Sequence, residues 1–450
     1  MTFSRSFLPP IAFATGMAIA WLSLFSPPTN ARGDDWPEFQ GAGRQNVWKE
    51  TGMRESFAPD SLTRRWSTPV SAGYSGPTVA GGQVYLVDRP DEGHERVVCV
   101  DEATGEPRWT HVYDCVYGQV GYGYGPRACV TIADGRAYAF GTMGHLHCLD
   151  AATGAVIWTK DLGAEYQVDL PIWGLTSSPL VEGDLVIVQA SAPAEGACVV
   201  AFDKLTGTER WRAFSDKAGY VSPIMITQGG KRVLVAWTGQ RIAGMNAATG
   251  EVYWEIPTKP NKMPINVPGP ALNEDGTRMF LSVFYDGSKM IGLDQTEGKT
   301  PTAELLWAQV GINERKTEAL HAMISPPYLR DGHVYGIDSY GQMRCLDMAT
   351  GTRIWENQEA VPEGRWATVF MVRQGNSDRT WMVTEQGDLI LARLTPSGYE
   401  EISRAKIIEP LTPLKQRESG AVMWAPPAFA NGCVFVKNDR ELICVSLAAE

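Results

Sequence analysis

The chain has 450 residues, of which 44% are hydrophobic and 20% are charged, and its formal net charge is −11. This composition is typical of a folded globular protein and excludes an intrinsically disordered chain. An acidic protein repels nucleic acid and anionic lipid, so we expect neither as a partner. The 46 Gly and 29 Pro residues indicate many turns and many short elements.

Residues 1–31 have the features of a secretory signal peptide. Arg5 is the only charge before Arg32, an apolar run extends over 11–25, and Thr29-Asn30-Ala31 places small residues where a signal peptidase reads them. We expect cleavage after Ala31, export to the periplasm or the extracellular space, and no membrane span afterwards. A retained membrane anchor is the alternative. The segment has no Cys, so we do not expect a lipid-modified N-terminal Cys.

After a first apolar run, a short pattern recurs along the chain at a nearly fixed interval. It consists of an apolar residue, Asp or Asn, three further residues ending in Thr, then Gly, and a Trp four residues after the Gly. The clean copies are residues 100–109, 149–158, 202–211, 245–254 and 346–355; a degenerate copy at 293–298 has its Trp delayed to Trp307, and another at 394–398 has lost both Asp and Trp. Copies this regular predict stacked, equivalent units.

The residues of the pattern predict a strand, a tight turn and a second strand. The apolar residues alternate before the Asp, whose carboxylate can accept backbone N–H bonds in the turn, and the Gly supplies a positive φ. The Trp that follows recurs too regularly to be catalytic. We expect it to pack against the neighbouring unit. These predicted docking residues are Trp66, Trp109, Trp158, Trp211, Trp254, Trp307 and Trp355.

A second signature, about 20 to 25 residues before the motif, supplies two more strands to each unit. It is a Pro-led apolar run, a Gly turn and another apolar run, as in 77–79 with 84–87 and in 179–181 with 185–188. Four antiparallel strands are one blade of a β-propeller. Residues 443–446 form the third strand of an eighth blade, and 62–66 supply its outer strand. The prediction is an all-β, eight-bladed β-propeller over 61–450, closed by an N-terminal strand, with an extension at 32–60.

The cysteines do not suggest a disulfide framework. Cys99, Cys148, Cys345 and Cys444 occupy equivalent positions in different units, which is too far apart for pairing, so we expect buried apolar side chains. Cys115 and Cys129 are close enough in sequence to pair, and the sequence leaves that open.

The Asp-x-x-Thr-Gly-x-x-x-Trp pattern resembles the tryptophan-docking repeat of the pyrroloquinoline-quinone (PQQ) propeller superfamily. The resemblance covers nearly all of 32–450, and residues 35–41 resemble the leader before the propeller in many exported bacterial proteins of this type. It implies one of two branches: periplasmic quinoprotein dehydrogenases with PQQ and calcium on the ring axis, or propellers without quinone, such as the scaffold lipoprotein of the outer-membrane β-barrel assembly machine. The chain lacks the adjacent Cys pair and the Cys-x-x-Cys-His motif of the first branch, and the anchor Cys of the second. No catalytic residue is therefore carried over.

Loops that join an outer strand to the next inner strand lie over the axis in this fold, and here they are rich in large aromatic residues. Such residues, with Arg, are typical of binding surfaces. The candidates for contact with a ligand or partner are Tyr74, Tyr122, Tyr124, Arg127, Trp173, Tyr220, His321, Arg365, Trp366 and Trp424. The alternative is that they fill the funnel by packing against one another. His145 and His147 could face a metal from one strand, but no third ligand is apparent, so we assign no metal site.

Together these observations predict an exported, non-catalytic, monomeric propeller that binds an envelope protein or a small ligand on its loop face. We expect no cofactor under this interpretation. The alternative is a PQQ-dependent alcohol or sugar dehydrogenase, which would need PQQ with Ca²⁺. A third possibility is a glycan-binding propeller.

Overall fold

The structure is a computed structural model that describes residues 1–4, 33–414 and 420–449. The chain divides into two compact units, Met1–Arg32 and Gly33–Glu450, and all the strands belong to the second. The predicted signal peptide lies almost entirely outside the described residues. Among the residues that are described, no helix is long and apolar enough to cross a membrane.

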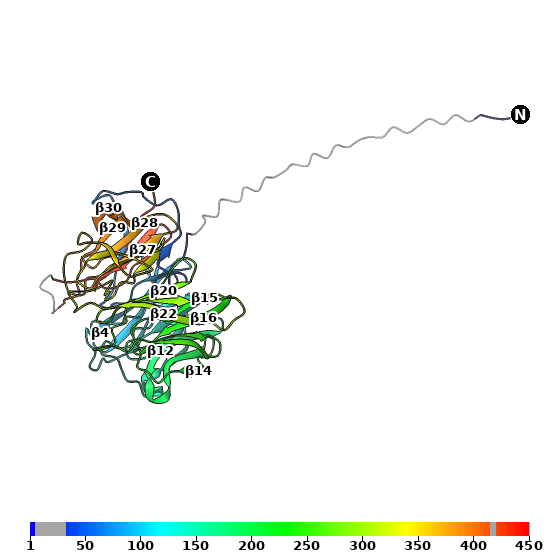
Figure 1. Cartoon of the computed structure of the whole chain (residues 1–450). Helices are drawn as coiled ribbons and strands as arrows, with labels where there is room; N and C mark the ends of the chain where they lie inside the picture. Colours follow the sequence, from blue (N-terminus) through cyan, green and yellow to red (C-terminus); the bar gives the residue numbers. More distant parts are fainter. Residues whose placement is uncertain (5–32, 415–419, 450) are drawn as a thin grey trace. The chain divides into compact units, whose positions relative to one another are not determined.

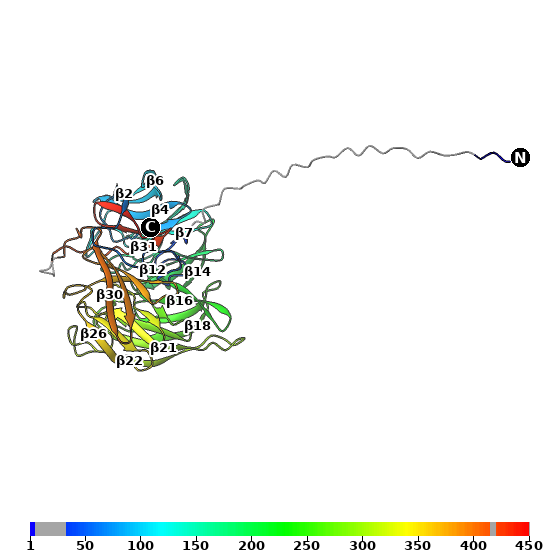
Figure 2. The ribbon, with the colours of Figure 1, turned by 90° about the horizontal axis from the view of Figure 1, so that it is seen from above.

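Within the described part of Gly33–Glu450, the strands form eight antiparallel blades of four strands, which confirms the predicted eight-bladed propeller (Figures 1 and 2). Blade 1 is β3 (Thr78–Ala80), β4 (Gln83–Asp91), β5 (His94–Asp101) and β6 (Pro107–Asp114); blade 2 is β7 (Thr131–Ala133), β8 (Arg136–Phe140), β9 (His145–Asp150) and β10 (Val156–Asp161). Blade 3 is β11 (Leu180–Glu182), β12 (Leu185–Ala192), β13 (Ala197–Asp203) and β14 (Glu209–Ala213); blade 4 is β15 (Ile224–Gln228), β16 (Lys231–Trp237), β17 (Arg241–Asn246) and β18 (Val252–Pro257). Blade 5 is β19 (Ala271–Leu272), β20 (Arg278–Val283), β21 (Gly287–Leu293) and β22 (Ala303–Gln309); blade 6 is β23 (Tyr328–Arg330), β24 (His333–Ile337), β25 (Met343–Asp347) and β26 (Arg353–Asn357). Blade 7 is β27 (Val369–Gln374), β28 (Arg379–Thr384), β29 (Asp388–Thr395) and β30 (Gly398–Lys406), and two single-turn helices, α1 (Leu162–Glu165) and η1 (Pro193–Glu195), lie in blades 2 and 3.

Blade 8 is built from both ends of the propeller sequence. β31 (Ala428–Ala430), β32 (Cys433–Lys437) and β33 (Glu441–Ser446) are followed by β2 (Arg64–Pro69), which pairs antiparallel with β33 and places Trp66 opposite Cys444. The predicted closure by an N-terminal strand is therefore confirmed. Closure gives β33 a partner on its outer side and so removes an exposed sheet edge.

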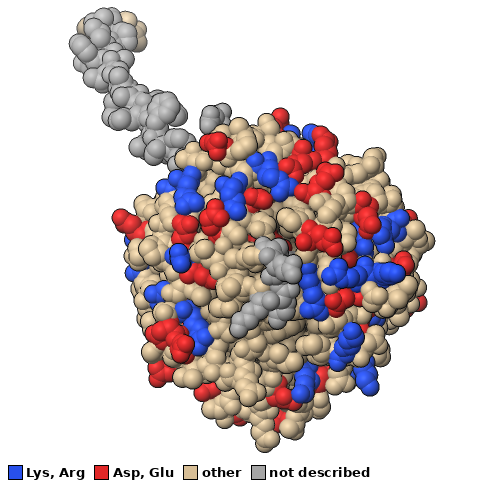
Figure 3. Space-filling view, turned by 90° about the vertical axis from the view of Figure 1, so that its left-hand side faces the viewer, with Lys and Arg blue, Asp and Glu red and all other residues tan. Residues whose placement is uncertain are grey.

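The antiparallel order of the strands divides the turns between two faces of the ring. Loops from an outer strand to the next inner strand share one face with the turns between second and third strands, and we call this the loop face. The motif turns, between third and fourth strands, lie on the opposite face. Acidic and basic side chains are interspersed over the face that Figure 3 shows, with no broad area of a single sign among the described residues.

The motif turns have the hydrogen bonds that the sequence predicts. The carboxylate of Asp101 accepts from the backbone N–H of Ala103 (3.0 Å) and of Thr104 (2.9 Å), and Gly105 has φ = 72°. A Cβ on Gly105 would lie 2.6 Å from the indole of Trp66, so this glycine is required by the close approach as well as by the turn.

Indole hydrogen bonds connect six of the eight blades to the blade that follows. The N–H of Trp66 donates to the carbonyl of Glu102 in blade 1, at 2.8 Å. Equivalent bonds run from Trp109 to Ala151, Trp158 to Lys204, Trp211 to Ala247, Trp307 to Met348 and Trp355 to Thr395, at 2.8–3.1 Å. Trp254 differs, because its N–H donates to the side chain of Gln228 in its own blade (3.0 Å). The turn that it would meet belongs to the degenerate copy, where Gly298 faces open space.

The N-terminal segment, residues 33–60, enters the central channel of the ring. Its strand β1 (Val47–Trp48) pairs in parallel with β27, and Trp36 exchanges two backbone hydrogen bonds with Val79 of blade 1. The buried guanidinium of Arg44 donates to the carbonyls of Pro179 (2.5 Å) and Pro223 (2.7 Å), which precede the inner strands of blades 3 and 4. Residues 36–48 of this segment therefore bond to inner strands on several sides of the channel, and Phe57 continues to the outer strand of blade 7, where its N–H donates to the hydroxyl of Ser403 (2.9 Å).

All eight cysteines are buried, and none is in a disulfide within the described residues. Cys115 and Cys129, whose pairing the sequence left open, are unpaired. Cys99, Cys148, Cys345 and Cys444 have no exposed surface, as predicted for small apolar side chains.

Candidate binding site on the ring axis

A cavity of about 140 Å³ lies among the loops that connect successive blades. Seven of the ten candidate residues line it: Tyr74, Tyr122, Arg127, Trp173, Tyr220, Trp366 and Trp424. Phe39 of the N-terminal segment also contributes, so the segment that fills the channel forms part of the wall. Residues far apart in the sequence therefore meet at one place because equivalent loops of different blades converge on the axis.

The aromatic rings of the site pack edge to face. The ring centroid of Tyr122 lies 5.8 Å from that of Trp366, 6.0 Å from that of Trp424 and 6.3 Å from that of Trp173. Trp173 in turn lies 4.7 Å from Tyr220. Such geometries are favourable between aromatic rings. The rings thus pack against one another and still leave a cavity between them.

Arg127 is the only charged side chain among the described residues that line the cavity. Its guanidinium donates to the carbonyls of Gly125 (2.7 Å), Gly121 (2.8 Å) and Tyr122 (2.7 Å), which fixes the loop on which it stands. The guanidinium carbon also lies 5.1 Å from the centroid of the Tyr74 ring. Burial lowers the pKa of Arg127, because the charged form is poorly solvated there.

Two buried donors in the cavity wall have no hydrogen-bond partner among the residues that the structure describes. They are the hydroxyl of Tyr74 and the indole N–H of Trp366, whose residues are 9% and 7% exposed. Burial raises the pKa of Tyr74, so its phenol stays neutral and can donate. A buried polar group without a partner is unfavourable, and a ligand acceptor would relieve it.

Tyr122 and Trp366 also have backbone φ values of 54° and 67°. The left-handed region is rarely occupied by bulky residues, and such strain concentrates at functional sites.

Tyr124 and Arg365 lie beside the cavity but do not line it. Tyr124 is partly buried against the aromatic cluster. The guanidinium of Arg365 forms an ion pair with Glu314 (3.0 Å) and lies 4.5 Å from the ring centroid of Trp366. Arg365 therefore supports the Trp366 ring from outside.

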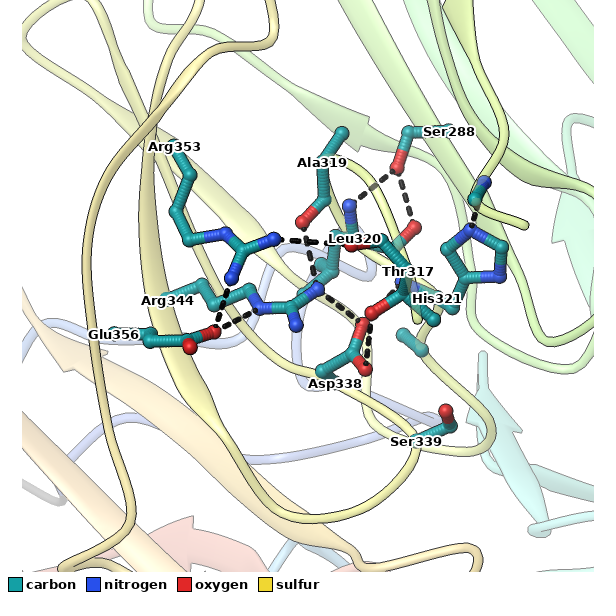
Figure 4. A network of polar contacts seen from close by, with 12 residues as sticks. Ser288, Thr317, Ala319, Leu320, His321, Asp338, Ser339, Arg344, Arg353 and Glu356 are labelled. Carbon is teal, nitrogen blue, oxygen red and sulfur yellow. Dashed lines mark hydrogen bonds and ion pairs between the residues drawn. The ribbon is translucent and has the colours of Figure 1, made fainter. Parts of the chain in front are cut away.

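His321 lies in a polar network between blades 5 and 6 and not in the cavity (Figure 4). Its Nδ1–H donates to the carbonyl of Phe284 (2.9 Å), and its Nε2 accepts the N–H of Gly311 (3.2 Å), an arrangement that requires the neutral imidazole. Burial accordingly lowers the pKa of His321. The same network contains a buried ion pair, Arg344 with Asp338 at 2.7 Å. His321 thus holds its loop in place.

Three histidines, His111, His145 and His147, lie together between blades 1 and 2. The sequence analysis identified only two of them. His147 and His145 were noted as neighbours on one strand, but His111, from β6, was not. Its Nε2 lies 3.2 Å from the Nδ1 of His147. Burial, together with His111 and His145, lowers the pKa of His147 to about 3. Among the described residues, no group of three or more His, Cys, Asp or Glu side chains is arranged to hold a metal ion.

The axial site does not fit PQQ with Ca²⁺, the cofactors of the dehydrogenase branch. Calcium takes oxygen ligands, including carboxylates, and no carboxylate is among the described lining residues.

The fold and the docked tryptophans define a propeller of the PQQ-like class with an aromatic cavity on its axis. The family described as "Outer membrane protein assembly factor BamB" matches residues 51–111 and 93–357. The chain therefore belongs to this family.

Curated relatives carry the same description at low identity. The chain is 24% identical over 296 residues to the outer membrane protein assembly factor BamB of Bordetella pertussis, covering 64% of this chain and 67% of that protein. It is 24% identical over 277 residues to the BamB of Burkholderia pseudomallei, covering 53% of this chain and 66% of that protein. The matches thus span about two thirds of the length of these relatives.

Solved structures of both branches resemble the ring. BamB from Moraxella catarrhalis superposes with a TM-score of 0.57 at 16% identity, covering 86% of this chain and 97% of that one. A quinohemoprotein alcohol dehydrogenase from Comamonas testosteroni superposes with a TM-score of 0.64 at 14% identity, covering 93% and 81%. At such identities the likeness shows the fold alone and does not separate the branches.

Proposed function

We propose that this protein is an exported, non-catalytic propeller that serves as a binding scaffold in the cell envelope, with the loop face around the axial cavity as its binding surface. The observation that carries the proposal is the composition of the cavity wall. It offers aromatic rings and one Arg, which suit binding, and no carboxylate among its described residues to hold calcium or act as a base.

The relatives support a protein partner. They are named outer membrane protein assembly factors, so the corresponding partner here is a protein of the envelope. The structure is suited to this role because loops from different blades are held by a closed ring, and rigidly positioned loops are common binding sites. The exposed Ile172 stands on the same face, next to the half-buried Trp173.

The test compares two exposed isoleucines. Ile172 is 56% exposed on the loop face, whereas Ile354 is 43% exposed on the outer strand β26. Tagged protein is recovered from cross-linked envelopes, and co-purifying proteins are quantified for Ile172→Ala, Ile354→Ala and the unmodified chain. We expect at least one envelope protein to be recovered with the unmodified chain and Ile354→Ala, and to be reduced several-fold with Ile172→Ala. Equal recovery with all three would contradict the proposal.

The dehydrogenase alternative has its own test. The purified protein is incubated with PQQ and Ca²⁺, and dye reduction is followed with alcohols and sugars as substrates. Because no carboxylate is among the described lining residues to hold Ca²⁺, we expect neither a bound quinone spectrum nor dye reduction. Both signals together would replace the scaffold proposal with an oxidoreductase.

A further inference from the structure

The charge of Arg127 is not balanced inside the axial cavity. None of the described carboxylates forms an ion pair with its guanidinium, and none lines the cavity. The carboxylate of Glu95, which is fully buried and does not line the cavity, raises the pKa of Arg127 by less than burial lowers it, and it accepts the hydroxyls of Tyr113 (2.7 Å) and Tyr117. A guanidinium has five N–H groups, and only three hydrogen bonds, all to carbonyls, are made here. A partly buried guanidinium with N–H groups that these three bonds do not use favours an anionic ligand.

The uncommitted polar groups of the wall are also donors. The hydroxyl of Tyr74 and the N–H of Trp366 are buried and have no partner. By contrast, the hydroxyl of Thr176 donates to the carbonyl of Tyr220 (2.5 Å), and that of Ser178 accepts the N–H of Cys129 (2.9 Å). The ligand must therefore present acceptors.

The size and the walls of the cavity restrict the rest of the ligand. A cavity of about 150 Å³ holds one benzene molecule, and this one has about 140 Å³. The rings of Tyr122, Trp173 and Trp424 form apolar walls suited to an aromatic or branched aliphatic group. The left-handed backbones of Tyr122 and Trp366 hold two of the rings in place before a ligand arrives.

We propose that the axial cavity binds a small carboxylate with a single apolar group, either one aromatic ring or a branched chain. The carboxylate lies against Arg127 and accepts from Tyr74 and Trp366, and the apolar group lies among the rings. This inference rests on the proposed function, because it assigns a ligand class to the scaffold's binding face. Among its described lining residues, the site has one cation and no carboxylate.

The experiment is a calorimetric titration of the full-length exported protein. Benzoate and 3-methylbutanoate are the probes; benzyl alcohol and benzylamine keep the ring but lack the anion, and acetate keeps the anion but lacks the apolar group. We expect saturable binding of the two probes, at least tenfold weaker binding of benzyl alcohol and acetate, and none of benzylamine. Equal affinity for benzoate and benzyl alcohol, or no saturable binding of either probe, would overturn the proposal.

Single-donor variants test the assigned residues while keeping an aromatic side chain at each position. Tyr74→Phe and Trp366→Phe should each weaken benzoate binding about ten- to a hundredfold, since each removes one hydrogen bond to a charged acceptor. Tyr253→Phe on the outer strand β18 removes a hydroxyl outside the cavity and should leave affinity unchanged. Arg127→Gln should abolish the preference for benzoate over benzyl alcohol. This variant also removes hydrogen bonds that hold the loop. The Tyr74→Phe and Trp366→Phe variants are therefore the decisive test of the assigned residues. Unchanged affinity in both Phe variants would overturn the assignment.

The two proposals fail separately. If Ile172→Ala loses partner recovery and no carboxylate binds, the scaffold proposal stands and the ligand-site proposal is wrong. If the carboxylates bind and both isoleucine variants recover partner equally, the ligand-site proposal stands and the scaffold proposal is wrong.

Discussion

Acid should destabilise this propeller through His147. The imidazole is 5% exposed, it is hydrogen-bonded to His111, and its ring centroid lies 4.2 Å from that of Tyr113. The charged groups nearby are committed elsewhere: Glu95 accepts the hydroxyl of Tyr113 (2.7 Å), and Asp161 lies 3.8 Å from the Nε2 of His145. A proton on His147 would therefore be buried beside two other imidazoles without a counter-ion.

The size of the effect follows from the pKa. Burial with the neighbouring histidines lowers the pKa of His147 from 6.5 to about 3. The unfolded chain therefore takes up a proton at a higher pH than the folded chain does. The free energy of unfolding is unaffected well above pH 6.5 and falls as the pH drops from there toward 3. Between about pH 7.5 and pH 5, the loss amounts to about 2 kcal/mol from this residue.

The assay is urea unfolding at about pH 7.5, 6 and 5, on the unmodified chain and on His147→Leu, which cannot titrate. We expect the unmodified chain to lose about 2 kcal/mol more than the variant over this range. The baseline stability of the variant is immaterial, because the comparison is of slopes. Parallel profiles for the unmodified chain and His147→Leu would refute the reasoning.

Three further changes test the packing of the ring by thermal or urea unfolding. Gly250 and Gly298 have φ values of 76° and 77°, but a Cβ on Gly250 would lie 2.8 Å from Trp211 while one on Gly298 would meet nothing. Both Ala variants should lose about 1–2 kcal/mol from the backbone, and Gly250→Ala should lose more; equal losses would contradict the docking contact. Asp338→Asn leaves Arg344 buried without its anion and should lower the free energy of unfolding by about 3–5 kcal/mol. The control is Asp378→Asn, at an exposed ion pair with Arg393, which should change this free energy by less than about 1 kcal/mol. Arg44→Met removes the donor to buried carbonyls of blades 3 and 4 and should lower the free energy of unfolding by about 2–4 kcal/mol. Amide exchange in residues 33–60 should also become faster. Unchanged exchange would show that Arg44 does not hold the segment.

The fold was predictable because its determinants are local and repeated. Each copy of the motif specifies a strand, a turn and a docking Trp within about ten residues, so the number of blades follows from counting copies. Trp66, which has no blade of its own before it, indicated the closure that β2 makes. The exception at Trp254 also has a local cause, since the motif of the next blade is degenerate.

The site was only partly predictable, because its contacts cross between blades. The position of loops over the axis was enough to select seven residues that line the cavity, but the same criterion selected His321, which is buried in a network. His111 was missed because it meets His147 only across a blade boundary. The role of the N-terminal segment was missed for a similar reason: Arg44 bonds to backbone carbonyls, and any residue could supply these.

The central claim is that partners engage the loop face, and site-specific photo-cross-linking in intact cells tests it most directly. A photoreactive residue is placed at Ile172 on the loop face or at Leu205, which is 47% exposed in a motif turn on the opposite face. The account predicts a discrete adduct with an envelope protein from position 172 and none from position 205. An adduct from position 205 alone, or equal adducts from both, would contradict it.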